Sequence, residues 1–184
     1  QAGKVYDGAH LHTFMSDQAL SEAVAHFRAG EAESRRTGGK LWSVFATACD
    51  VSEERYLKLI VARLATYLQI PGYGEALVNV NGWDMDTLNS FRSAPIVAGM
   101  TGAIDSVASY TELAEIEKLI PLEWRPAAVG DAKTCAQRWL DQFNAGADGI
   151  IIHASTPEEF APVLAEYERI RPSALFAQRT NRPG

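Results

Sequence analysis

Residues 144–159 read NAGADGIIIHASTPEE and contain the end of one helix, a strand and the start of the next helix. Gly146 suits the left-handed residue that ends a helix, and the apolar run from Gly149 to His153 predicts a buried strand. The sequence TPEE at 156–159 combines an N-cap, a proline at the first helical position and a capping box, so we expect a helix from Pro157 to about Ile170. This order is typical of βα units on a parallel sheet.

The same alternation of short apolar runs and helical periods predicts three earlier units. Their strands are expected at Tyr6 to Phe14, Leu41 to Cys49 and about Arg125 to Val129. Apolar residues at helical spacing follow each strand: Leu20, Ala23, Val24 and Phe27; Leu57, Ile60, Val61, Leu64 and Leu68; and Cys135, Ala136, Trp139, Leu140 and Phe143. The chain therefore holds four βα units, and its fold class is α/β.

Two further regions complete this plan. Residues 71–109 are loosely patterned and rich in Gly and Asn, so we interpret them as an insertion ahead of a helix at about Leu113 to Ile120. Residues 1–172 then form the folded unit. Residues 173–184, with Arg179 and Arg182, are expected to be a solvated tail.

The first and fourth units share the pattern Asp-Gly-x-x-aliphatic-His, at residues 7–12 and 148–153. Each copy leads directly into a helix. The histidine of each copy therefore falls at the carboxyl end of a strand, which is the edge where βα enzymes place their chemistry.

Composition excludes several classes of partner. The 184 residues include 17 basic and 23 acidic side chains, and the formal net charge is −6. An acidic chain lacks the basic footprint that binding to a nucleic-acid backbone requires. The longest apolar-leaning stretch, Ser93 to Ile104, is shorter than the roughly 20 residues of a transmembrane helix. We therefore expect neither nucleic acid nor a membrane as a partner.

Other polar or reactive residues have plainer structural roles. Cys49 and Cys135 form no disulfide or metal-binding pattern, which indicates small buried side chains in a reducing, cytoplasmic setting. Asp50, Asp131 and Thr156 stand before helices, so each is expected to cap one.

The length suggests an incomplete barrel. A whole (β/α)8 barrel takes about 250 residues, whereas four units fill this chain, which begins with Gln1 and is interpreted as a piece. Half a barrel has open edges and an uncovered apolar inner face. We expect a missing amino-terminal barrel half or another copy of the chain, in a homo-oligomer, to cover that face. The alternative is a self-sufficient open parallel sheet.

At AGKVYDG (2–8), VGD (129–131) and above all NAGADGIIIH (144–153), the sequence resembles the carboxyl-terminal half of luciferase-like flavin or deazaflavin oxidoreductases and monooxygenases. It is most similar to the branch that uses coenzyme F420. The resemblance implies the carboxyl-terminal half of a (β/α)8 TIM barrel. It also implies hydride transfer between F420, or alternatively FMN, and a small organic substrate.

The resemblance further implies which residues meet the ligands. His12 and Thr13 match a strand end that reaches the cofactor or the substrate phosphate, and His153 matches the opening of the last strand on the pocket. The insertion matches a variable segment that covers the substrate. Its expected lid aromatics are Tyr73, Trp83 and Phe91.

Hydride transfer needs a flat apolar slot for the ring, hydrogen-bond donors at its polar edge and a proton donor or acceptor beside the substrate. Because a histidine titrates near neutrality, His12 and His153 are the catalytic candidates. His12, Thr13 and Ser155 are the candidates for cofactor binding near a helix N-terminus. The plainer interpretation is a packed histidine and helix-capping hydroxyls, and His26, in the middle of a helix, is interpreted as structural.

Two alternative functions stay open. The spacing His10-x-His12, with His153 as a third ligand, is compatible with a metal-dependent barrel hydrolase. No acidic residue is clearly placed as a further ligand, so we expect no metal. The third possibility is a non-catalytic barrel half that serves oligomer contacts.

Overall fold

The computed structural model describes residues 1–176 of the chain. In this part of the chain, four parallel strands form one sheet. The strands are β1 Gly8–His10, β2 Lys40–Cys49, β3 Ala128–Gly130 and β4 Gly149–His153. Each of the other three strands pairs with β2, which is the central strand. The alternation of parallel strands with helices confirms the α/β class.

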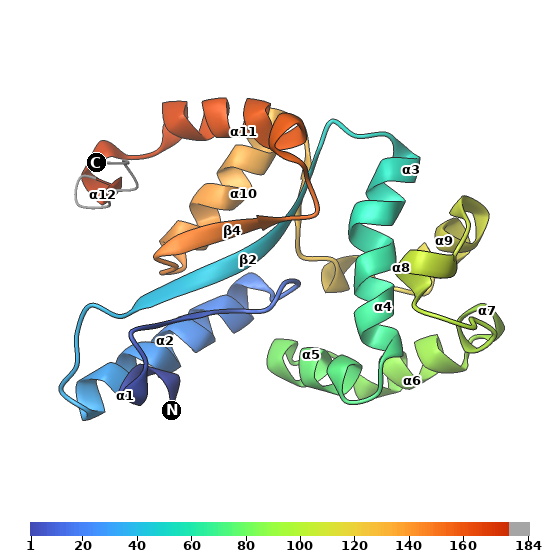
Figure 1. Cartoon of the computed structure of the whole chain (residues 1–184), viewed down its shortest axis with the longest axis horizontal. Helices are drawn as coiled ribbons and strands as arrows, with labels where there is room; N and C mark the ends of the chain where they lie inside the picture. The colour runs from blue at the N-terminus through green and yellow to red at the C-terminus, as the bar shows by residue number, and fades with distance from the viewer. Residues whose placement is uncertain (177–184) are drawn as a thin grey trace.

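Helices connect the strands and pack against parts of the sheet. They are α1 Ala2–Val5, α2 Asp17–Glu33, α3 Glu53–Tyr56, α4 Arg63–Gln69, α5 Tyr73–Asn81, α6 Met85–Ser93, α7 Pro95–Ala98, α8 Ile104–Val107, α9 Tyr110–Glu117, α10 Ala132–Asn144, α11 Pro157–Ile170 and α12 Ser173–Phe176. A π-helical turn, η1, spans Leu57–Ala62, and a 3-10 turn, η2, spans Leu122–Trp124. Figure 1 shows α10 and α11 together on one side of β2 and β4, and α3 to α9 gathered beyond the end of β2.

The strand order differs from that of four successive barrel units. Trp42 of β2 pairs with His10 of β1 and with Gly149 of β4, so β1 and β4 lie on opposite edges of β2. In a barrel half, β4 would pair with β3. Here β3 is only three residues long and meets β2 at its carboxyl tip, from Thr47 to Cys49. It is therefore too short to give β4 a full ladder.

Two strands are shorter than the sequence predicted. The first was expected over Tyr6 to Phe14 but pairs only at Gly8–His10, since the chain then turns through Phe14, whose φ is 62°. The third begins at Ala128 rather than at Arg125. Pro126 has no N–H for a ladder, and the turn η2 occupies the residues before it.

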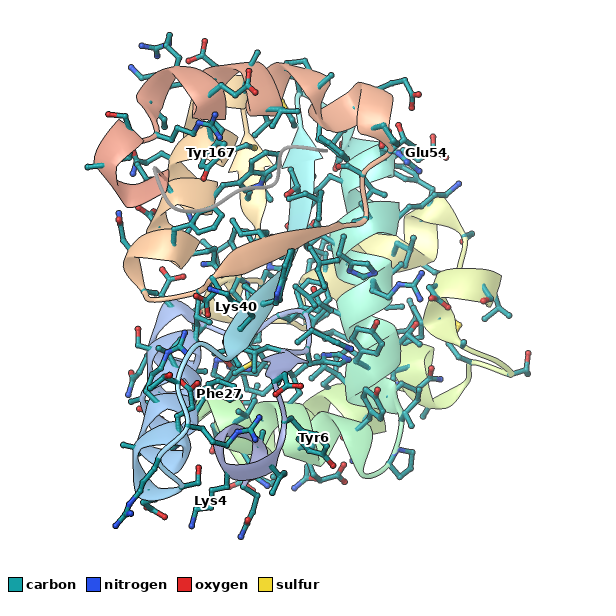
Figure 2. The ribbon with its side chains drawn as sticks, turned by 60° about the vertical axis from the view of Figure 1, so that its left-hand side comes forward. Lys4, Tyr6, Phe27, Lys40, Glu54 and Tyr167 are labelled. Carbon is teal, nitrogen blue, oxygen red and sulfur yellow. The ribbon has the colours of Figure 1, made fainter. Side chains whose placement is uncertain are left out.

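Alternate residues of β2 enter two separate cores. Phe45 and Cys49 pack against α10 and α11, where Tyr167 extends from α11 toward α10 and stacks on Phe143 at 5.7 Å between ring centroids (Figure 2). Ala46 and Ala48 instead pack against the apolar side chains of η1, α4 and the insertion. The sheet therefore has helices on both faces near its carboxyl end.

The glycines of the repeated Asp-Gly pattern lie against β2. A Cβ at Gly8 would come within 2.6 Å of the Lys40 carbonyl oxygen, and one at Gly149 would come within 2.6 Å of the Trp42 indole. Asp148 also accepts a hydrogen bond from the Leu41 N–H at 2.8 Å. The repeat thus reflects close contact of the two flanking strands with the central one.

The helix after β2 differs from the expected one in its start and in its interior. Ser52, not Asp50, caps it, by accepting from the Arg55 N–H. Asp50 instead has φ 49°, and its N–H donates to the Gly130 carbonyl, which prolongs the pairing of β2 and β3. The regular helix expected through Leu57–Ala62 is a π turn. The caps predicted at Asp131 and Thr156 are confirmed.

The insertion is helical and supplies core. Phe91 is only 2% exposed, so it is not the lid aromatic that the sequence predicted. Phe91 is drawn inward because the short amphipathic helix α6 buries its apolar side. Trp83 is half-buried and stacks on Trp124 at 4.8 Å, and its role as a lid aromatic stays a prediction. Tyr73 differs from Phe91 and is 48% exposed.

Cys49 and Cys135 are buried free thiols, as expected. Burial raises the pKa of the Cys135 thiol to about 12, so it carries almost no nucleophilic thiolate at neutral pH. The expected tail begins with the short helix α12, and Arg179 and Arg182 lie outside the described residues. None of the helices described here combines the length and apolar character needed to cross a bilayer.

A bidentate ion pair links the helices that follow β2 and β4. Arg55 Nε and Nη2 donate to Glu159 at 2.8 and 3.0 Å, and this pairing lowers the pKa of Glu159. A lowered folded-state pKa stabilises the protein above the unfolded pKa near 4.5, and this contribution is lost as the pH falls through the folded value. We expect Glu159→Gln to lower the free energy of unfolding by about 0.5–1 kcal/mol at pH 7, and the difference to shrink toward pH 3.

Urea unfolding at several pH values measures this difference. Glu158→Gln is the matched control, because Glu158 is exposed and its side chain lies next to the pair in sequence. A Glu159→Gln deficit that stays constant between pH 7 and pH 3 would contradict the ion-pair explanation.

Candidate functional site

The candidate site lies at the carboxyl ends of β1 and β4. His153 is the last residue of β4 and pairs in register with Ala46 of β2, while His12 follows β1 by two residues. Their charges interact, because His12 contributes to lowering the pKa of His153. The fold thus brings together the two histidines that the sequence singled out, although His12 and His153 are 141 positions apart in the chain.

His12 lies among aromatic rings. Its imidazole meets Tyr67 of α4 edge-on at 4.7 Å and Tyr73 of α5 at 5.4 Å, and the two tyrosine rings stack at 5.6 Å. His12 Nδ1 is 2.9 Å from the Thr13 carbonyl oxygen, which can only accept. Nδ1 therefore carries the proton, and Nε2 of the neutral ring is left as an acceptor.

His153 is held in its neutral form. Burial lowers its pKa, and the positive charges of Arg63 and His12 lower it further. Its buried Nδ1 has no hydrogen-bond partner among the described residues. A half-buried neutral imidazole with an unused polar atom is suited to exchanging a proton with a ligand.

Sequence reasoning missed a polar cluster beside these histidines. Arg63 of α4 forms an ion pair with Asp105 of α8 at 2.8 Å and a side-chain hydrogen bond with Tyr67. The Asp105 N–H donates to the Thr66 hydroxyl at 2.9 Å, which ties α8 to α4. A charged residue on a largely apolar helix ordinarily predicts a solvated side chain, so no pattern in the sequence pointed to this group.

The two predicted hydroxyl ligands have different surroundings. Thr13 is 3% exposed, and its Oγ1 has no partner within the part of the chain that the structure describes. The Ser155 hydroxyl donates to the Thr47 carbonyl at 2.5 Å. Ser155 therefore holds its loop against β2, and in this arrangement its proton is not offered to a phosphate. Their role in cofactor binding stays a prediction.

The backbone is strained at the carboxyl edge of the sheet. Phe14, Asp50 and Ala154 each have a positive φ, of 62°, 49° and 81°, and each lies in a segment that follows a strand. A further non-glycine residue with a positive φ, Arg35 at 57°, follows helix α2 instead. Left-handed non-glycine residues are uncommon and cluster at functional sites. This strain marks the edge that carries His12 and His153, and it is not visible in the sequence.

Asn81 of the insertion holds the loop that follows β1. Its Nδ2 donates to the Phe14 carbonyl at 3.1 Å, and its Oδ1 accepts from the Ser16 N–H at 2.7 Å. These two bonds hold the loop on either side of Met15, directly after the left-handed residue Phe14. The insertion thus positions the loop of His12 and Thr13, a role that sequence reasoning did not assign.

Metal binding finds no support in this arrangement. In residues 1–176, no group of three or more His, Cys, Asp and Glu side chains is arranged to hold a metal ion. His10 is exposed and lies opposite Trp42 on the sheet. The alternative built on His10, His12 and His153 therefore has no ligand set in the described residues.

The fold is similar to that of a solved structure, the coenzyme F420 dependent tetrahydromethanopterin reductase from Methanopyrus kandleri. The TM-score is 0.61 and the sequence identity is 14%. The match covers 96% of this chain and 45% of the reductase chain, so this chain spans less than half of that protein's length. No family model matches the chain, and no curated protein matches it in sequence. The likeness therefore concerns the α/β fold.

We expect Asn81→Ala to destabilise the protein by about 1–2 kcal/mol, because two partly buried backbone groups of the β1–α2 loop, the Phe14 carbonyl and the Ser16 N–H, lose their partner. Urea unfolding measures the change. Asn79→Ala is the matched control on the same helix, since Asn79 is exposed and its change is expected to stay within about 0.5 kcal/mol. Equal effects of the two substitutions would show that Asn81 does not hold the loop.

Proposed function

We propose that the chain belongs to an oxidoreductase that binds coenzyme F420 at the carboxyl edge of its sheet and transfers hydride between it and a small organic substrate. The observation that carries the proposal is the similarity to an F420 dependent reductase over 96% of this chain. His12 and His153 meet at the edge where such βα folds place their chemistry. FMN is the alternative cofactor.

The side chains at this edge fit a flat ring with polar margins. Tyr67 and Tyr73 offer aromatic surface, and half of the Tyr73 side chain is exposed. Nδ1 of His153 is a buried polar atom without a partner in the described residues, and Nε2 of His12 is free to accept a proton. When bound, F420 supplies a carrier for the hydride.

The protein's own part is to orient the ligands and to move a proton. His12 is orientated by its bond to the Thr13 carbonyl and by its two tyrosine neighbours. Its Nε2 can accept a proton from the substrate in one direction and return it in the other. His153, kept neutral by burial and by Arg63, is the second group able to do so.

Binding of F420 tests this proposal directly. We expect F420 to bind, as measured by quenching of its fluorescence, and to bind more tightly than FMN measured in parallel. His12→Ala removes the imidazole that borders Tyr67 and Tyr73, so it is expected to weaken F420 binding about tenfold, or about 1.4 kcal/mol. His26→Ala, an exposed position on α2, is the control and should have no effect.

Absence of binding by both cofactors would overturn the proposal. Tighter binding of FMN than of F420 would show that the cofactor is a flavin rather than a deazaflavin, and would keep the proposed site. An equal loss in His12→Ala and His26→Ala would show that the binding does not take place at this edge.

We also propose that a second copy of the chain covers the open face of the sheet. Trp42 and Ile151 are 36% and 41% exposed, and Ile151 pairs with the half-buried Val44. Together they form a contiguous apolar strip, which is costly to leave in water. Two copies amount to nearly the length of the reductase chain, of which one copy spans 45%.

We expect the protein to sediment as a dimer or a larger oligomer, and Trp42→Glu to dissociate it, because a carboxylate would be buried against an apolar surface. Sedimentation velocity measures the change. Leu164→Glu is the matched control, since Leu164 is 44% exposed on α11, away from the strip. A wild-type monomer would contradict self-association and leave the face to a different unit.

A further inference from the structure

Arg63 stands at the junction of the π turn η1 and helix α4. The residues of η1 other than Lys58 are buried, so the turn is anchored in the core. A π turn contains an extra residue relative to an α-helix, which rotates the residues after it. Arg63 is the first residue beyond this rotation, and its charge acts on His153 at the end of β4.

The guanidinium of Arg63 is only partly used by the protein. An arginine has five N–H donors. Nη1 meets Asp105 at 2.8 Å, and the Tyr67 hydroxyl takes part in a further hydrogen bond. The Arg63 side chain is 43% exposed although its partner Asp105 is only 17% exposed. Asp105 therefore fixes one side of the guanidinium and leaves part of it open to a ligand.

Arg63 is the permanent positive charge of this cluster. Burial lowers the pKa of the neighbouring His153, and the charges of Arg63 and His12 lower it further, so His153 stays neutral beside Arg63. Asp105 is the carboxylate paired with the cluster, and it is already engaged by Arg63. The exposed part of a fixed guanidinium beside an aromatic surface suits a planar oxyanion, which arginine binds through two parallel hydrogen bonds.

We propose that Arg63 binds a carboxylate or phosphate group of the ligand at this site, and that Asp105 of the insertion is its positioning residue. The inference rests on the proposed function and adds that the ligand is anionic. It also gives the insertion a part in recognition, because Asp105 lies on α8 and is itself held by the Thr66 hydroxyl. The anion belongs either to the cofactor or to the substrate, and the two sources can be separated by experiment.

Inorganic phosphate is the probe. We expect added phosphate to shift the NMR resonances of the His12 and His153 rings in the wild-type protein. It should also raise the pKa of His153, because a bound anion offsets the Arg63 charge that lowers it. Arg63→Gln is expected to weaken phosphate binding at least tenfold. Arg63→Lys keeps the charge without the planar donor pair, so its affinity for phosphate should lie between those of the wild type and Arg63→Gln.

Two further variants test the positioning role of Asp105 and provide a control. Asp105→Asn leaves Arg63 charged but removes the carboxylate that orients it, so phosphate binding should weaken less than in Arg63→Gln. Arg169→Gln removes a surface arginine that pairs with Glu166 on α11, outside the site. Its response to phosphate should equal that of the wild type. Circular dichroism and thermal unfolding verify that each variant is folded.

Repeating the phosphate titration with saturating F420 distinguishes the sources of the anion. Loss of the Arg63-dependent response assigns the anion to the cofactor, and its persistence assigns it to the substrate. A phosphate response that is absent, or unchanged in Arg63→Gln, overturns the inference even when F420 binds. An Arg63-dependent phosphate response without F420 binding overturns the proposed cofactor but keeps the anion site.

Discussion

The structure depends on one strand that hydrogen-bonds to all the others. Lys40–Cys49 pairs with β1 near its start, with β4 along its middle and with β3 at its tip. Its alternate side chains enter two cores, so both layers of helices are anchored on the same ten residues. The close approach of Gly8 and Gly149 to this strand follows from the same constraint, since a side chain at either position would collide with it.

The central strand also decides where the chemistry can take place. Because β1 and β4 flank it in parallel, the residues after both strands meet at one edge, and His12 and His153 come within electrostatic range. At the opposite edge, Arg28 forms ion pairs with both Glu31 and Asp148, so this edge has a structural role. Left-handed backbone follows three of the strands at the first of these edges, at Phe14, Asp50 and Ala154, and also occurs at Arg35 after α2. Thr13 Oγ1 and His153 Nδ1, two buried polar atoms without a partner among the described residues, also lie at the first edge.

The insertion has a larger part in this edge than its composition suggested. Asn81 holds the loop after β1, Tyr73 borders His12, and Asp105 orients Arg63. Phe91, by contrast, is buried in the core beneath the insertion, and the half-buried Trp83 packs against that core. A segment that the sequence predicted to cover the site is thus also its support.

The sequence by itself determined the features that depend on neighbours along the chain. The helix after β4, its cap at Thr156 and the cap at Asp131 follow from side chains that bond backbone three residues away. Tertiary structure alone decided the pairing of β4 with β2, the π turn before Arg63 and the contacts of Asn81 and Asp105. These depend on groups far apart in the chain, whose meeting is set by packing around the central strand rather than by any local pattern.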